Sequence, residues 1–330
     1  MEKNLAYRLY LAAPGGAAAR DVTRLVKSLT WSGSLRQTAR QVSVRLAVPA
    51  GSGVEPPALE EGAALVLQEE DRRLFTGQLV TATTSTQSSV ADLGALDGGR
   101  FLAGNQGWYR FDNTTAEAAA ARVAADFNVR TGRLARTGVA LSRKFPGTAL
   151  DKLLATMYSL AGERTGRRYL LRFTGEGVLE VVEKAETASL ELVRTMGVTN
   201  TWDLSSLCNS VSIYTGEGAL VRRVGDSASQ ALNGRLEHVI TQKDGEDAGP
   251  EARAWLADHG LQQTLTVELL DPPTSLITGE AVSLRDTGSG VSGLFWVDSD
   301  THTWKNKLHT GKFKLNFRSL MNTASSGQSV

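Results

Sequence analysis

The run Asp286-Thr287-Gly288-Ser289 spells the tetrapeptide of aspartic proteases. That chemistry needs two such carboxylates sharing one proton at close range, and the sequence holds a single copy. Asp-Thr-Gly-Ser-Gly between two strand-like runs is also ordinary hairpin chemistry, because glycine supplies the positive φ that tight turns require. We therefore predict a turn at 286–290 and no catalytic carboxylate there.

Asp300, His302 and His309 form a second candidate, for a metal site or an acid–base pair. Zinc needs three or four ligands, and we find no third ligand at a recognisable spacing. His302 lies among Asp300, Thr301 and Thr303, a composition typical of a polar turn. We predict that these side chains make structural hydrogen bonds, and that the chain holds no metal ion and no cofactor.

Cys208 is the single cysteine, which excludes an intramolecular disulfide and a multi-thiolate zinc site. It lies at the start of a strand-like run, so we predict a buried thiol of the core. The sequence has no Gly-x-Ser-x-Gly elbow, Walker loop or His-Glu-x-x-His motif, and Gly15-Gly16 and Gly98-Gly99 lack the strand–loop–helix frame of phosphate sites. We predict that the protein is not an enzyme and has no catalytic, cofactor-binding or metal-binding residues.

The formal net charge of +1 provides no global field for holding nucleic acid by its phosphates, so we expect no nucleic-acid binding by this chain alone. Arg164, Arg167 and Arg168 form a small basic cluster. A solvated surface is the simpler interpretation, and a salt-sensitive protein contact is the alternative.

The chain has 330 residues, 41% hydrophobic and 22% charged, which predicts a globular protein of two or three domains. Met1–Leu11 has no apolar core of a signal peptide, and no run approaches the roughly 18 apolar residues of a membrane span. We expect synthesis in the cytoplasm and no membrane insertion. If the protein leaves the cell, we expect a route other than a signal sequence, such as lysis.

The segment from Leu5 to Phe101 alternates with the period of two that half-buried strands require. The predicted elements are strands at Leu5–Leu11, Gln41–Val48, Ala64–Leu67 and Leu74–Val80, a charged turn at Glu69–Arg73, a loop at Ala50–Pro57 and a short helix around Asp21–Lys27.

Between Asn113 and Lys184 the apolar period becomes helical. Thr114 and Glu117 have capping-box spacing before an apolar stripe that ends at Phe127, which predicts a helix. A second helix follows Pro146-Gly147. Strands at Tyr169–Phe173 and Val178–Val182, joined by a turn at Thr174–Gly177, complete a small α+β unit.

From Leu190 to Phe317 the pattern returns to β, interrupted by one helix between Pro250 and Gly260. The Ser/Thr/Gly-rich tail after Leu320 is expected to be loose. The predicted strands are Val211–Tyr214, Leu236–Thr241, Thr264–Leu270, Glu280–Leu284, Leu294–Val297 and Lys312–Phe317.

The two β regions resemble each other, either because one unit is duplicated or because any two β-hairpins look alike at this level of detail. In each, a glycine opens a strand, a polar turn follows, and a second strand carries a further glycine, consistent with the corners of a small barrel. The matched positions are Gly62, Leu65, Leu67, Phe75, Gly77 and Leu79 in the first region and Gly279, Val282, Leu284, Gly293, Phe295 and Val297 in the second.

Short motifs in order along nearly the whole chain resemble the XkdQ/YqbQ family, which comprises tail proteins of the defective prophage PBSX and related particles. Ala12–Ala19 carries no such motif, so no contact is assigned to it. The motifs are Trp31-Ser32-Gly33, Ala39-Arg40, Phe75-Thr76-Gly77, Asn113-Thr114-Thr115, Asp126-Phe127, Gly293–Val297, Asp300–Trp304, His309-Thr310 and Lys312–Phe317.

The resemblance implies a mainly β fold with an α+β insert. Two tail-tube-like β-barrel domains, at 1–102 and 190–322, would flank a small α+β domain at 103–189, and 323–330 would form a loose tail. It also implies a baseplate hub similar to the central hub of contractile myophage tails, whose two barrels per chain let a homotrimer present six similar faces. Implied partners are the tail tube, the spike and other baseplate proteins.

The resemblance leaves open whether the particle is a phage, a bacteriocin or another injection device. Two competing functions remain. A tail-associated cell-wall hydrolase would require convergent carboxylates or a Cys/His pair in a cleft. A carbohydrate- or peptide-binding β protein would require a stripe of aromatic side chains, whereas the six Trp and six Tyr are scattered.

Overall fold

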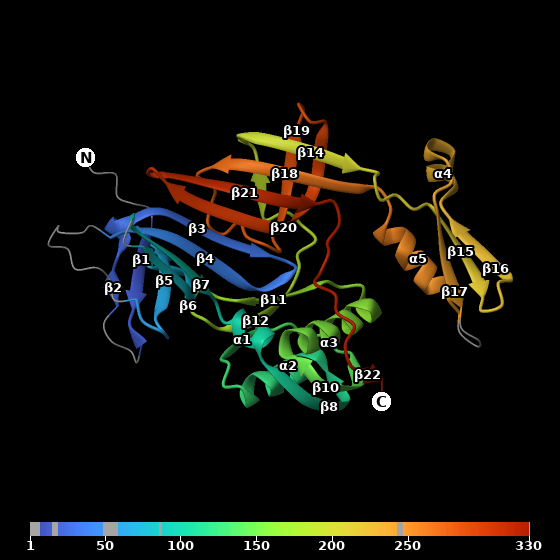
Figure 1. Ribbon diagram of the computed structural model, residues 1–330, viewed down its shortest axis with the longest axis horizontal. Coiled ribbons are helices and arrows are strands. Elements are labelled where there is room, and N and C mark those ends of the chain that lie inside the picture. Colours follow the sequence, from blue (N-terminus) through green and yellow to red (C-terminus); the bar gives the residue numbers. More distant parts are fainter. Residues whose placement is uncertain (1–6, 15–18, 49–58, 86–87, 243–246, 330) are drawn as a thin grey trace. The chain divides into compact units, whose positions relative to one another are not determined.

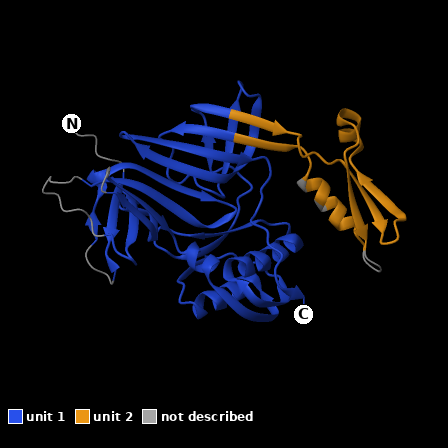
Figure 2. Cartoon of the chain, in the orientation of Figure 1, with its two compact units in different colours: residues 1–198, 266–330 blue, residues 199–265 orange. Residues whose placement is uncertain are grey.

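The computed structural model describes residues 7–14, 19–48, 59–85, 88–242 and 247–329. The predicted loop at Ala50–Pro57 and the Gly15-Gly16 pair lie outside these residues. The chain divides into two compact units, residues 1–198 with 266–330 and residues 199–265 (Figure 2).

The first unit is built on a large, mainly antiparallel sheet, of which residues 199–203 and 262–265 belong to the second unit (Figure 1). Its strands follow the spatial order β14-β18-β21-β20-β3-β4-β7-β6-β5-β1-β2, with β19 and β13 continuing from β20 on a side branch. Their bounds are β1 Arg8–Ala12, β2 Arg20–Asp21, β3 Val26–Ser34, β4 Gln37–Ala47, β5 Ala64–Glu69, β6 Arg72–Ser85, β7 Ser88–Leu96, β13 Leu190–Leu192, β14 Gly197–Asp203, β18 Gln262–Leu270, β19 Ala281–Asp286, β20 Val291–Lys305 and β21 Leu308–Asn316.

Buried and more exposed side chains alternate along these strands, as expected for a sheet with one face in the core. On β4, Val42, Val44 and Leu46 are buried while their neighbours face outward, and Phe313 and Leu315 do the same on β21. The prediction of a mainly β fold is confirmed. The predicted closed barrels are not present, because the pairings among the described strands leave an open path and join both β regions into one sheet through β20 and β3.

The two β regions share one strand order. The first runs β3-β4-β7-β6-β5-β1 and the second β14-β18-β21-β20-β19-β13, so the strands correspond one to one in space and in chain order. One pairing differs, because β1 is antiparallel to β5 whereas β13 is parallel to β19. Residues 204–261, which make up most of unit 199–265, lie in the chain between β14 and β18, where the first region has the short connection from β3 to β4.

Residues 99–183 of the first unit form helices and short sheets. They enclose a separate hydrophobic core around Phe111, Leu154 and Tyr158. The predicted helices and hairpin are confirmed, although β8, β9 and β10 escaped the sequence pattern. The elements are α1 Gly99–Gly104, β8 Gln106–Thr115, α2 Ala116–Asp126, β9 Thr131–Leu134, β10 Ala140–Ala149, α3 Leu150–Thr165, β11 Tyr169–Phe173 and β12 Leu179–Glu183.

Two local predictions differ from the structure. The N-cap of α2 is Thr115, whose hydroxyl accepts the N–H of Ala118, and Glu117 accepts bonds from the N–H and hydroxyl of Thr137 instead of closing a capping box with Thr114. The short helix expected around Asp21–Lys27 is a single 3-10 turn at Thr23–Leu25.

The second unit is a small α/β module. Its sheet has the order β16-β15-β17, with helices α4 and α5, and its core includes Cys208, Val211 and Ile213. The bounds are β15 Ser210–Thr215, β16 Leu220–Gly225, α4 Ser227–Asn233, β17 Glu237–Gln242 and α5 Gly249–Asp258. Among the residues that the structure describes, no helix has the length and apolar character needed to cross a membrane.

The C-terminal residues expected to be loose are instead bound to the α+β part. Gln328–Ser329 forms β22, which pairs with β10. The Arg143 side chain donates to the carbonyl oxygens of Ser326 and Gly327, and the N–H of Ser326 donates to the Thr156 hydroxyl of α3. The composition of the tail concealed these contacts, because they use its backbone more than its side chains.

Ending the chain at Asn322 is therefore expected to lower the free energy of unfolding by about 1–3 kcal/mol, since several hydrogen bonds with a net value of roughly 0.5–1.5 kcal/mol each are lost. Chemical denaturation would measure the change, and faster amide exchange in α3 would locate it. The control removes Val330 alone. Unchanged stability in the shorter chain would show that these contacts contribute nothing.

Candidate functional site

The inward face of β20 carries polar side chains where an apolar face is expected. Asp300, His302 and Trp304 alternate along the strand, and their exposed fractions are 1%, 0% and 6%. A buried polar group is costly unless it is hydrogen-bonded, and a buried charge unless it is also paired. The partners of these side chains therefore decide what the site can do.

Asp300 is held by a bidentate ion pair with Arg40 of β4. The distances are 2.9 Å from Nη1 to Oδ1 and 2.5 Å from Nη2 to Oδ2. The N–H and hydroxyl of Thr278 also donate to Oδ1, at 2.7 and 2.6 Å. The guanidinium stacks over Trp31 of β3, with Cζ 4.3 Å from the ring centroid. The charge of the carboxylate is therefore balanced by Arg40, and both of its oxygens accept hydrogen bonds.

His302 belongs to the same group of side chains. We call Arg40, Asp300, His302 and His309 the buried polar cluster. Its Nε2 lies 2.9 Å from the carbonyl oxygen of Leu276, and its Nδ1 lies 3.0 Å from Nε2 of His309. Because the carbonyl can only accept, Nε2 of His302 carries the proton and Nδ1 accepts from His309. Burial lowers the pKa of His302 to about 4, so the ring is neutral at physiological pH.

His309 on β21 lies at the edge of the cluster. Burial lowers its pKa, opposed by the carboxylate of Asp271, which lies 3.4 Å from Nδ1. Its ring stacks on Trp304 with centroids 4.3 Å apart. The predicted hydrogen-bonding role of Asp300, His302 and His309 agrees with this geometry. The predicted polar turn at His302 is wrong, because the residue lies inside a 15-residue strand.

This arrangement joins elements of the sheet that are far apart in the sequence. The cluster lies where β20 pairs with β3, from Ser299 opposite Ser34 to Lys305 opposite Ser28. It therefore connects the first β region to the second. Within the described part of the chain no group of three or more His, Cys, Asp or Glu side chains is placed to hold a metal ion.

The other predicted positions occupy structural roles. Asp286 closes the turn between β19 and β20 by accepting the N–H and hydroxyl of Ser289, at 2.7 and 2.6 Å. Cys208 is buried, and its thiol donates to the carbonyl oxygen of Ser210. In the basic cluster, Arg167 pairs with Glu183. Arg164 and Arg168 donate to nearby backbone carbonyls.

Sequence reasoning missed two buried cations. Arg40 was noted as part of a motif but not as the partner of Asp300, because nothing local links residues 260 positions apart. Lys184 is buried, donates from Nζ to the carbonyl oxygen of Leu320 at 2.7 Å, and has its pKa lowered by desolvation to about 8. A lysine two residues after a predicted strand carries no local signal of burial.

Comparisons with known proteins agree with this description. A family model described as YQBQ-like matches residues 29–316. The phage-like element PBSX protein XkdQ of Bacillus subtilis (strain 168) is 26% identical over 305 residues, which cover 87% of this chain and 90% of that protein.

Two solved structures show the same fold. The 43 kDa tail protein of prophage MuSo2 from Shewanella oneidensis matches with a TM-score of 0.70 at 15% identity, over 94% of this chain and 98% of that one. The E. coli c3393 protein, a component of the type VI secretion system with structural similarity to the T4 bacteriophage tail proteins gp27 and gp5, matches with a TM-score of 0.53 at 10% identity, over 92% of this chain and 76% of that one.

Proposed function

The chain belongs to the YQBQ-like family, and from this membership we propose that it is a structural baseplate hub of a contractile phage tail or tail-like injection particle. In this proposal three copies form a ring that joins the six-fold tail tube to the three-fold spike, in contact with other baseplate proteins. The hub catalyses no reaction. It is made in the bacterial cytoplasm, assembled into the particle and released by lysis.

The shared strand order of the two β regions is the observation that carries this proposal. A chain with two like-shaped units lets three copies imitate a ring of six. We keep 1–102 and 190–322 as the two tube-like domains and 103–189 as the α+β insert, with 204–261 as a further module inserted into the second.

Details of the backbone support the same correspondence. Gly62 and Gly279 each precede a strand by two residues, before β5 and β19, and each has a positive φ, of 86° and 97°. The N–H of Leu79 donates to the carbonyl oxygen of Ala63, as the N–H of Val297 does to that of Glu280. A register shift follows at the same place in both, between Leu79 and Thr81 and between Val297 and Ser299.

The correspondence predicts which strands meet between copies. Within the chain, the second half of β20 pairs with β3. The equivalent strands are β6 and β14. The pairing of β6 with β5 ends at Gln78, and the following residues, Val80–Ser85, are exposed. β14 is the terminal strand of the sheet path. Long unpaired edges are a liability that natural proteins cover.

We therefore place β6 of one copy against β14 of the next, which closes the ring through three copies of one heterologous contact. Both segments are rich in threonine, Val-Thr-Ala-Thr-Thr-Ser in β6 and Gly-Val-Thr-Asn-Thr-Trp-Asp in β14. Such β-branched side chains suit cross-strand pairing.

Thr201→Pro is expected to prevent assembly. The N–H of Met196 donates to the carbonyl oxygen of Glu268 in β18, so strand alternation directs the N–H of Thr201 to the free edge. Proline removes that donor and blocks strand addition. Analytical ultracentrifugation across a concentration series should show a trimer for the unaltered chain and a monomer for the variant.

Thr201→Val is the matched control, since it keeps the backbone donor and should still form trimers. The proposed ring would be contradicted by a trimer that survives Thr201→Pro, or by an unaltered chain that stays monomeric at every concentration. A monomer that degrades peptidoglycan would favour the alternative, a tail-associated cell-wall hydrolase.

A further inference from the structure

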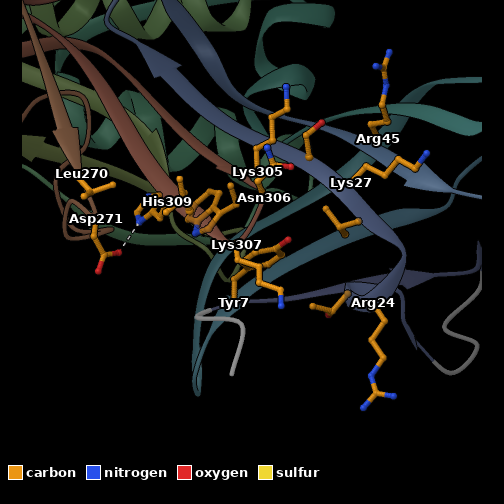
Figure 3. A pocket seen from close by; sticks show the side chains of 15 residues that line it. Tyr7, Arg24, Lys27, Arg45, Leu270, Asp271, Lys305, Asn306, Lys307 and His309 are labelled. Atoms are coloured by element: carbon orange, nitrogen blue, oxygen red, sulfur yellow. Dashed lines mark ion pairs between the residues drawn. The ribbon is translucent and has the colours of Figure 1, made fainter. Parts of the chain in front are cut away.

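A basic groove of about 880 Å³ lies beside the turn between β20 and β21, within the first unit. Five cationic side chains and a single carboxylate, that of Asp271, line it (Figure 3). The cations come from strands and turns in three separate parts of the chain and comprise Arg24, Lys27, Arg45, Lys305 and Lys307. Neither the composition nor the buried polar cluster accounts for this concentration of charge.

Most of these cations make no ion pair within the described part of the chain. Arg45 pairs with Asp92, whereas the other four make no ion pair with any residue that the structure describes. In Figure 3, Lys305 and Arg45 extend to one side of the groove, and Lys307 and Arg24 to the other. Cations spread in this way suit an extended anionic chain better than one small anion.

The turn that carries two of these lysines has an unfavourable backbone. Lys305 pairs with Leu308, so Asn306 and Lys307 are the two central residues, with φ of 52° and 64°. Turns with two positive φ values favour Asn-Gly, because a side chain at the second position is strained. A lysine held there against the local preference points to a function for its charge.

Exposed aliphatic side chains accompany the charge. Leu270 and Leu308 line the groove and are 55% and 57% exposed. The aromatic residues of the groove, Tyr7 and Trp304, are only 5% and 6% exposed. Single-stranded nucleic acids are held by stacking bases on accessible aromatic faces, which this groove does not offer. Leucines beside cations favour a polypeptide with both acidic and apolar side chains.

We propose that this basic groove is a docking site for an acidic, leucine-bearing segment of a partner protein. The acidic side chains contact Lys27, Lys305 and Lys307, and the apolar ones cover Leu270 and Leu308. The proposal concerns the single chain and does not depend on the trimer or on the hub role.

A fluorescein-labelled peptide of Glu-Glu-Leu repeats serves as the probe, and fluorescence anisotropy with the full chain measures its affinity. Removing each lysine, by Lys305→Gln or Lys307→Gln, should weaken binding about two- to fivefold. Lys307→Gly should weaken binding equally while raising the thermal midpoint, because glycine relieves the positive φ. Lys152→Gln, an exposed lysine on α3, is the control and should change neither.

Three comparison probes define the partner. Lys-Lys-Leu repeats should not bind, and Glu-Glu-Ser repeats and a single-stranded oligo(dT) of equal charge should bind more weakly than Glu-Glu-Leu. Equal or tighter binding of the oligo(dT) would assign the groove to nucleic acid and overturn the proposal. So would peptide binding that is absent or unaffected by Lys305→Gln and Lys307→Gln.

Discussion

Asp300→Ala is expected to lower the free energy of unfolding by about 3–5 kcal/mol, because it leaves the Arg40 guanidinium buried without its counter-ion. The exposed fractions of the two side chains are 11% for Arg40 and 0% for Asp300. Thr278 loses its acceptor at the same time. Urea unfolding followed by tryptophan fluorescence suits the measurement, since Trp31 and Trp304 lie beside the cluster.

The double variant Arg40→Met with Asp300→Leu should be more stable than either single variant. Replacing a whole buried ion pair with apolar groups is often neutral, whereas removing one partner strands a charge. A double-mutant cycle then gives a strong coupling energy. Additive single effects would contradict the idea that the pair acts as one buried unit.

An exposed ion pair of the same sheet provides a matched control. Arg45 and Asp92 face each other across β4 and β7, with side chains 57% and 55% exposed. Asp92→Ala should change the free energy of unfolding by less than about 1 kcal/mol, because solvent screens the pair. A comparable loss at both sites would mean that burial does not distinguish them.

The sequence predicted elements well where one local pattern decides the structure. Val42, Val44 and Leu46 fix β4 by alternation, and the spacing of Leu150, Leu153 and Leu154 fixes α3. It failed where tertiary contacts override the pattern. Only Leu294–Val297 of β20 was predicted, because the inward positions beyond it are the polar Asp300 and His302.

The candidate site was only half predictable. No local pattern joins Arg40 to Asp300, since that pairing depends on β20 lying beside β3. No local pattern reveals the basic groove either, because its cations come from three separate parts of the chain, at 24–27, 45 and 305–307, and meet only after the sheet has formed. Predicting contacts between residues so far apart in the sequence requires knowledge of which strands pair and in which register.

The pH dependence of stability should reveal two buried groups with opposite effects. Burial lowers the pKa of His302 from 6.5 to about 4, so between these values the unfolded chain binds more protons and stability falls as the pH falls. Burial raises the pKa of Asp97 from 3.8 to about 6. There the folded chain binds more protons, and stability rises as the pH falls.

Each shift corresponds to about 3 kcal/mol, at 1.36 kcal/mol per pKa unit, so the two effects largely cancel between pH 4 and 6 in the unaltered chain. His302→Asn removes the first effect and should leave a protein that gains stability relative to the unaltered chain as the pH falls. Asp97→Asn removes the second and should steepen the acid loss, to which His309 adds because burial lowers its pKa too. Urea unfolding at a series of pH values measures both slopes. Parallel curves for the two variants would show that neither group titrates in the folded protein as its burial requires.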